Sequence, residues 1–283
     1  MLLRAWIAGA RLRRRFRRRR LPAVPGDERR RRWIAEHAPG RSFADIGGLH
    51  RISGDVAFWA EEAGASPVTL FDAGDPRYTD FPQKREARGS AVRFVQGDLE
   101  DPQSVAAIGE HDIVWCVGVI YHTPNPFQQL LHLRRITREL LYLGSHTIPE
   151  VPGLEQACVF YPYLGERARA AYASAHERPE DLWGIGTPFK DEPMLGYGNF
   201  WWGITRSALR AMLRAARFEV VEEITTYETP FFCELVVRPI DADPVLPPVT
   251  YYREYGERRE AGEEPPPFET YYDWLRERGE RPY

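Results

Sequence analysis

Short apolar runs alternate with amphipathic helical stretches between Trp33 and Val237. The runs are rich in β-branched and aromatic residues, as strands usually are. They are Ser42–Ile46, Val68–Asp72, Val92–Gln96, Asp112–Val117, Leu140–Leu143, Phe218–Glu222 and Phe231–Val237. Helical stretches such as Gly54–Ala63 and Asn125–Arg138 separate the first five. This alternation predicts an α/β domain, in which a seven-stranded, mostly parallel sheet carries helices on both faces.

Three segments depart from this pattern. The last two runs lie close together around Thr229 and Pro230, which predicts a C-terminal antiparallel hairpin at the sheet edge. Residues 149–200 bring Pro, Gly, Tyr and Trp into the domain, and we expect this long insertion to form a cap over the functional site. Residues 239–283 are rich in Pro, Tyr and acidic side chains, and we expect a tail that wraps the domain or contacts a partner.

The amino-terminal segment is strongly basic. Residues 1–32 hold thirteen arginines against Asp27 and Glu28, a net charge of +11. Because the whole chain has a net charge of −3, residues 33–283 together carry −14. We expect a basic arm over residues 1–32, followed by the sheet domain over residues 33–238. Three readings of the arm are open: a solvated tail, an arm that contacts anionic lipid headgroups, and an arm that binds nucleic acid.

Composition excludes several classes of protein. The chain has 283 residues, 43% of them hydrophobic, which is enough apolar surface for a folded core. Its 3 cysteines are too few for a disulfide scaffold and lack the spacing of a zinc site, so we expect no metal. No apolar run approaches the length of a membrane span. The expected setting is the cytoplasm, with peripheral contact at the inner membrane face if the arm binds lipid.

Acidic residues close three consecutive predicted strands. Asp45 precedes the glycine turn Gly47–Gly48, where a carboxylate suits a ligand that carries an ammonium or sulfonium. Asp72 ends the second strand and can accept from two ribose hydroxyls. Asp98, with Leu99, follows the third strand, where an acid can accept from an adenine amino group. A single acid of this kind is often a solvated strand end or a helix cap, but three in order indicate one ligand site.

This combination resembles the class I S-adenosylmethionine-dependent methyltransferases over roughly residues 33–238. The resemblance implies a Rossmann-like methyltransferase sheet and S-adenosylmethionine (SAM) as cofactor. The glycine turn stands at the family's first motif, although Leu49 and His50 replace its later glycine. The positions that the resemblance places at the cofactor are Asp45, Gly47, Gly48, Asp72, Ala73, Asp98, Leu99, Val117, Gly118 and Tyr121.

A narrower resemblance covers Val119–Pro126, Leu130–Thr137 and Asn199–Thr205. These segments are similar to the branch that includes the tRNA wobble-uridine carboxymethyltransferase and its uncharacterised relatives. The basic groups with which that enzyme handles a carboxylated cofactor have no match here, so its activity is not implied.

Two histidines are candidate general bases. His122 follows the fourth strand, where it should face the transferred methyl group, and a histidine can titrate near neutral pH. His146, at the end of the fifth strand, is the weaker candidate. A structural histidine that hydrogen-bonds a loop is the ordinary alternative. Trp201, Trp202 and Tyr197 are candidate substrate-stacking residues, with core packing as the alternative for the two tryptophans.

We therefore expect a methyltransferase that acts on a hydroxyl of a small molecule or saccharide. The acidic body and the aromatic insertion favour this class, and an RNA substrate is the second reading. A non-catalytic protein with the same fold is a third reading. A nicotinamide-dependent oxidoreductase is disfavoured, because Asp45 would face a pyrophosphate.

Overall fold

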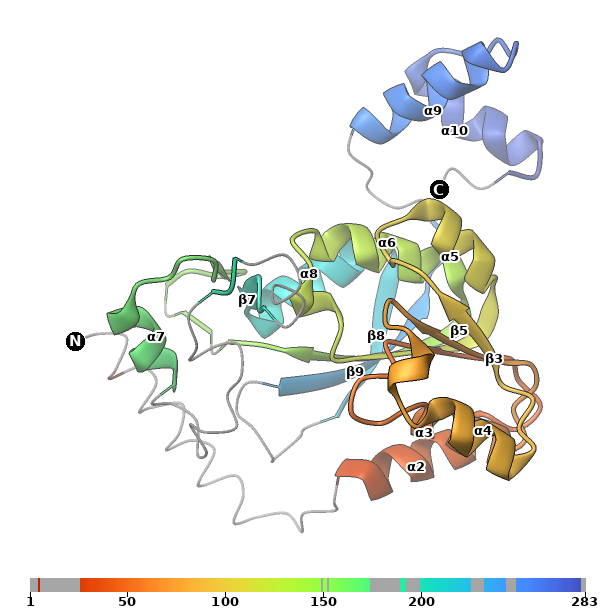
Figure 1. Cartoon of the computed structure of the whole chain (residues 1–283). Helices are drawn as coiled ribbons and strands as arrows, with labels where there is room; N and C mark the ends of the chain where they lie inside the picture. The colour runs from red at the N-terminus through yellow and green to blue at the C-terminus, as the bar shows by residue number, and fades with distance from the viewer. Residues whose placement is uncertain are drawn as a thin grey trace.

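Figure 1 shows the computed structural model of the chain. The structure describes residue 5 and residues 26–148, 150–151, 153–173, 189–191, 199–224, 232–242 and 248–280. Most of the basic segment, the turn near Thr229 and Pro230, and Tyr197 lie outside these residues.

One seven-stranded sheet organises the described residues. Its strands are β1 (Phe43–Ile46), β2 (Val68–Asp72), β3 (Arg93–Gln96), β4 (His111–Val117), β5 (Thr137–His146), β8 (Phe218–Ile224) and β9 (Phe232–Pro239). They lie in the order β3-β2-β1-β4-β5-β9-β8. The first five strands are parallel, and β9 runs antiparallel to both β5 and β8. The predicted sheet and its C-terminal hairpin are confirmed.

Helices cover both faces of the sheet (Figure 1). The helices are α2 (Gly26–His37), α3 (Asp55–Glu62) and α4 (Phe81–Arg88) on one face, and α5 (Pro102–Ile108), α6 (Pro126–Ile136) and α8 (Arg206–Ala215) on the other. Side chains alternate along each strand, so Val114 and Cys116 of β4 face α6 while Ile113 and Trp115 face α2. The two cores fix the position of the carboxyl ends of the strands, where α/β proteins bind ligands.

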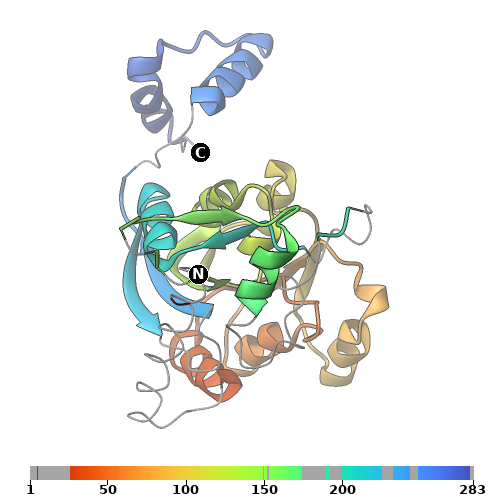
Figure 2. The same cartoon turned by 90° about the vertical axis from the view of Figure 1, so that its left-hand side faces the viewer.

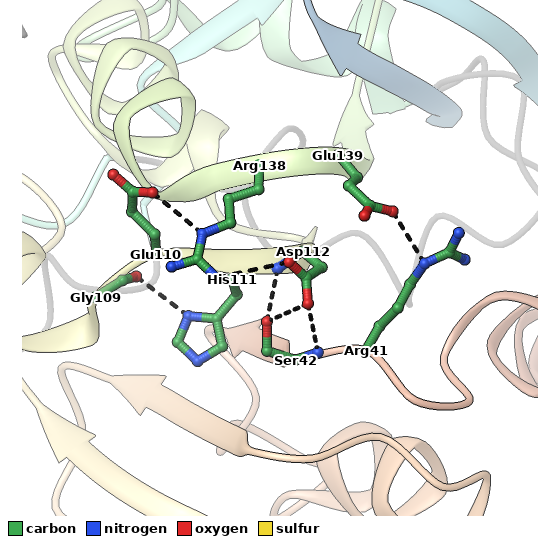
Figure 3. Close-up of polar contacts among 8 residues, drawn as sticks. All are labelled: Arg41, Ser42, Gly109, Glu110, His111, Asp112, Arg138 and Glu139. Atoms are coloured by element: carbon green, nitrogen blue, oxygen red, sulfur yellow. Dashed lines mark hydrogen bonds and ion pairs between the residues drawn. The ribbon is translucent and has the colours of Figure 1, made fainter.

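The amino ends of β1, β4 and β5 are joined by polar contacts (Figure 3). The backbone N–H and the hydroxyl of Ser42 both donate to Asp112 Oδ2, at 2.9 and 2.7 Å. Arg138 lies 3.6 Å from the other carboxylate oxygen and also donates to Glu110. The Ser42 hydrogen bonds, with help from Arg138, hold the pKa of Asp112 below its ordinary value. Because ligands bind at the opposite edge, this network serves the fold.

Helix α2 is tied to the sheet by a buried carboxylate. Glu234 of β9 is fully buried, and it accepts hydrogen bonds from Arg29 and from Arg30 Nε, the latter at 2.7 Å. Helix α2 spans the expected boundary at residue 32, and it places two arginines of the expected basic arm against the sheet. The sequence pattern could not show this, because the carboxylate that binds the two arginines lies more than 200 residues away.

The described part of the insertion forms a small second sheet. Strand β6 (Cys158–Phe160) pairs with β7 (Trp202–Ile204), and α7 (Glu166–Ala173) follows β6. Ile148 N donates to Ile204 O at 2.9 Å, so this sheet is attached where the chain leaves β5. We refer to β6, β7 and residues 161–173, 189–191 and 199–201 as the cap.

The C-terminal segment forms two helices, α9 (Pro248–Glu260) and α10 (Phe268–Glu277). They enclose a small core of Tyr251, Tyr271 and Leu275. In Figures 1 and 2 this pair stands apart from the sheet. Tyrosines spaced one helical turn apart, such as Tyr251 and Tyr255, make the amphipathic face.

Candidate functional site

The carboxyl ends of β1, β2 and β4 bring the predicted acids and glycines together. β1 lies between β2 and β4, so its glycine turn has a neighbour on each side. Gly47 N donates to Phe71 O of β2 at 2.7 Å, and a β-carbon at Gly47 would lie 2.4 Å from Val119, which follows β4. Gly47 has a φ of 80°, a conformation that favours glycine.

Asp45 is a buried carboxyl group at the end of β1, with an exposed fraction of 1%. Burial, and then the nearby charge of Asp72, raise its pKa to about 8, although the backbone N–H of Ala57 opposes the shift. No described residue hydrogen-bonds its Oδ2 atom. A β-carbon at Gly48 would lie 2.1 Å from this oxygen, so glycine is required there. A cation at this point would remove the electrostatic cost of the ionised group.

Asp72 is held by two backbone N–H groups rather than by another side chain. Its Oδ2 accepts from Leu49 N at 2.9 Å and its Oδ1 from Gly74 N at 2.7 Å. Each carboxylate oxygen can accept a second hydrogen bond. The buried Leu49 side chain lies over Gly74, close to the carboxylate. Gln96 Nε2 donates to Ala73 O at 3.3 Å, which continues the edge toward β3.

A further carboxylate links the loop after β3 to the loop after β4. Asp98 is exposed, and its Oδ1 accepts from Glu100 N at 2.8 Å. Glu100 accepts from the hydroxyl of Thr123 and from Asn125 Nδ2, the latter at 2.8 Å. Sequence reasoning missed Glu100, although it directly follows Leu99. Its contacts couple the predicted adenine side of the site to the segment that carries His122.

Beyond β4, aromatic and histidine side chains form a compact cluster. Gly118 N donates to Gly144 O at 2.9 Å, and a β-carbon at Gly118 would lie 3.4 Å from Tyr121 Oη. The Tyr121 ring stacks on Phe200 at 4.6 Å and meets His146 edge-on at 4.8 Å. Burial raises the pKa of Tyr121, which keeps its phenol protonated at neutral pH.

His122 and His146 both border this cluster. The two rings contact Phe200 at 5.1 and 4.7 Å, and His146 contacts Phe232 at 5.5 Å. Sequence reasoning missed Phe200, which precedes β7, and Phe232 of β9, because both are far from the two histidines in sequence. Phe200 lies in the Asn199–Thr205 segment, in which only the two tryptophans were candidates.

His122 is oriented by the cap. Its Nδ1 lies 2.8 Å from Asn199 O, and a carbonyl can accept only, so Nδ1 carries the proton and Nε2 is the accepting nitrogen. Burial lowers the pKa of His122 to about 4, and the nearby His50 adds to this effect. The imidazole is therefore neutral at pH 7, whereas the sequence led us to expect titration near neutrality.

The two tryptophans among the candidate stacking residues lie beside the cluster rather than within it. Trp201 N donates to Tyr121 O at 2.9 Å, while the Trp201 ring contacts Phe189 at 5.4 Å. Trp202 Nε1 donates to Pro124 O at 2.9 Å, which fixes its ring.

The described residues contain no group of three or more His, Cys, Asp or Glu side chains placed to hold a metal ion. None of their helices is long and apolar enough to span a membrane.

Solved structures identify the fold. No protein-family model matches the chain, and no curated protein matches it in sequence. The N-terminal domain of EvdMO1 with S-adenosylhomocysteine (SAH) bound is 22% identical, with a TM-score of 0.50 over 76% of this chain and 81% of that one. A second structure of that domain, in the presence of SAH and D-fucose, gives 21% identity and a TM-score of 0.50, over 77% of this chain and 84% of that one.

Two further structures are similar. The [4+2]-cyclase SpnF is 15% identical, with a TM-score of 0.50 over 80% of this chain and 84% of its own. Magnesium protoporphyrin IX methyltransferase from Synechocystis with bound SAM is 16% identical, with a TM-score of 0.47 over 75% of this chain and 77% of its own. With the strand order described above, the structures with TM-scores of 0.50 show that the chain has the Rossmann-like methyltransferase fold.

Proposed function

We propose that this protein is a SAM-dependent methyltransferase that modifies a hydroxyl group of a small molecule or saccharide. The observation that carries the proposal is the buried Asp45 carboxyl, whose Oδ2 no described residue hydrogen-bonds, beside the glycine turn and Asp72. Two acids at one buried edge are unfavourable by themselves, and a cationic ligand relieves this cost. SAM carries both an ammonium and a sulfonium.

The residues present fit this cofactor. Asp45 would hold a cationic group, Asp72 would accept from ribose hydroxyls, and Asp98 with Leu99 would border the adenine. Gly47 and Gly48 leave the backbone open at the point where a side chain would collide with Val119 or Asp45. Bound SAM supplies an activated methyl group, and the protein has to align the acceptor and exclude water.

The acceptor hydroxyl is placed at the cluster of Tyr121, His122 and His146. His122 is neutral at pH 7 and can accept a hydrogen bond from the hydroxyl through Nε2. A base with a pKa near 4 is too weak to deprotonate the free hydroxyl, so its main contribution is to orient that hydroxyl. It accepts the proton only as the new carbon–oxygen bond forms, when the proton becomes much more acidic. His146 is the second candidate for this role.

A saccharide is the first acceptor class to test. A structure of the same fold was solved in the presence of SAH and D-fucose, and the cap presents exposed aromatic rings. The RNA reading had the basic arm as its only direct support. Two arginines of that segment, Arg29 and Arg30, bind Glu234 instead. SpnF shares the fold and is named a cyclase, so methyl transfer needs a direct test.

The deciding experiment is isothermal titration calorimetry of the full-length chain with SAM and with SAH. We expect micromolar binding of both ligands, followed by release of SAH when SAM is incubated with a mixture of saccharide acceptors. Failure of the folded protein to bind either ligand would refute the proposal and favour the non-catalytic reading. Binding without any SAH release would favour a chemistry other than methyl transfer.

The protonation state of His122 gives a pH prediction. Its imidazole should titrate with a pKa of about 4, so it stays neutral from about pH 5 upward and can serve an acceptor throughout the neutral range. Two-dimensional NMR of the histidine ring protons between pH 3.5 and 8 measures this, with His122→Gln to assign the signal. A midpoint near 6.5 would contradict the buried, cap-oriented geometry.

A further inference from the structure

A row of five aromatic rings crosses the cap. In order, the row contains Tyr163, Phe189, Trp201, Phe160 and Trp202, and we call it the aromatic row. Successive ring centroids lie 5.1, 5.4, 6.1 and 4.9 Å apart. Phe160 and Trp202 face each other across the β6–β7 pair, so the sheet register itself builds this end of the row.

The aromatic row is partly exposed and firmly held. Tyr163 is 74% exposed and Phe160 is 47% exposed, which is unusual for rings so close to a buried core. The hydrogen bond from Trp202 Nε1 to Pro124 O fixes one end. Tyr161 N donates to Trp201 O at 2.9 Å and fixes the middle. A ligand would therefore meet surfaces that are already ordered, at little entropic cost.

The middle of the row is attached to the candidate site through the backbone. The backbone of Trp201 bonds directly to Tyr121, and the carbonyl of Asn199 orients His122. Asn199 also clamps the segment of Phe189, because its side chain bonds both Lys190 N and Lys190 O, at 3.1 and 2.6 Å. The segment just before β7 thus positions both His122 and the neighbouring rings of the row.

We propose that the aromatic row binds the glycan portion of an acceptor with several sugar rings, whose reactive hydroxyl lies at Tyr121 and His122. This inference rests on the proposed methyl transfer and names its substrate class. Rings that follow at intervals of 4.9 to 6.1 Å can stack against successive sugar units, each of which presents an apolar C–H face. An acceptor with a single sugar ring would contact at most one ring of the aromatic row.

Charge in the cap argues for a neutral glycan rather than an anionic membrane. The cap contains two acidic side chains, Glu166 and Asp191, and three basic ones, so its net charge is only +1. A surface that inserts aromatic rings among anionic lipid headgroups normally has a basic excess around them. Arg169, one of the three basic side chains, donates to Leu164 O at 2.6 Å within the cap itself.

The test is a glycan array probed with the full-length protein in the presence of SAH. We expect binding to glycans of three or more rings and none to monosaccharides. Replacing both Phe160 and Tyr163 with alanine should weaken the best glycan at least tenfold by calorimetry, while SAH affinity stays unchanged. Tyr252→Ala is the matched control, because this tyrosine is 69% exposed on α9, outside the cap, and its loss should change neither affinity.

Each outcome separates this inference from the proposed function. SAH binding without any glycan binding, or glycan binding that survives the Phe160 and Tyr163 substitutions, would overturn the glycan assignment and leave the cofactor assignment intact. Failure to bind SAH would remove the proposed function itself. A parallel experiment measures sedimentation of the protein with phosphatidylglycerol vesicles. If the parent binds vesicles but no glycan, and the double variant loses vesicle binding, the row binds a lipid surface and the glycan assignment is overturned.

Discussion

Replacing Asp45 with asparagine is expected to abolish binding of SAM while it stabilises the free protein. The substitution keeps the shape of the side chain but removes the charge that would pair with a cationic ligand. Calorimetry should show micromolar SAM binding to the parent and none to Asp45→Asn. Binding by the parent should also strengthen as pH rises from 6 to 8, because the carboxyl has to ionise from a pKa of about 8. Unchanged affinity in the variant would contradict the assignment.

The same substitution predicts a pH-dependent gain in stability. Below the ordinary pKa of 3.8 the carboxyl is protonated in folded and unfolded chains, so it costs nothing. As pH rises to about 8, the unfolded chain ionises while the folded state resists, and the parent loses stability. One pKa unit corresponds to about 1.4 kcal/mol. We expect a net gain of about 1–3 kcal/mol for Asp45→Asn at pH 8, where the relieved ionisation cost exceeds the cost of an unpartnered buried amide N–H. At pH 4 only the amide cost remains, so the variant should be less stable than the parent.

Replacing Glu234 with glutamine is expected to lower the free energy of unfolding by about 3 kcal/mol. The carboxylate is fully buried and compensates two arginines, and loss of one member of a buried ion pair leaves an uncompensated charge. Burial opposes the charge on Arg30, but the pairing with Glu234 outweighs it and raises the pKa of Arg30. Urea denaturation, followed by the fluorescence of Trp33 and Trp115 on the same face, measures the change.

A matched control lies on the same hairpin. Glu219 pairs with Arg238 at 2.7 Å, but the two side chains are 50% and 58% exposed. Water screens such a pair, so Glu219→Gln should cost less than about 1 kcal/mol. Equal small losses for Glu219→Gln and Glu234→Gln would show that α2 does not depend on the buried carboxylate.

Local patterns predicted the sheet well because strands carry their signal in adjacent residues. Val68–Asp72 was predicted to the residue, and Asp45 and Asp72 were placed at strand ends, where parallel topology brings them together. The contacts that the sequence could not show join distant segments: Arg30 with Glu234, and Phe200 with Tyr121. No periodicity encodes such pairs, since each depends on the completed fold.

The C-terminal helices were missed for a different reason. Proline clusters and acidic charge gave no helical pattern, yet Tyr251 and Tyr255 share a helix face that packs against Tyr271 of the next helix. Aromatic contacts between two short helices outweigh the weak helix preference of either sequence. The sequence likewise showed that residues 149–200 are rich in aromatic side chains. The order of the rings in the aromatic row, however, depends on the pairing of β6 with β7.

The placement of β9 between β5 and β8 has a consequence for how the protein is made. On the ribosome, Arg29 and Arg30 emerge early, whereas Glu234 follows some 200 residues later. The central sheet cannot be completed until β9, which ends at Pro239, has left the exit tunnel. Before that point, α2 cannot form its ion pairs with Glu234. Late closure by distant segments slows folding and leaves strand edges open during synthesis. We therefore expect nascent chains that stop before β9 to require chaperones.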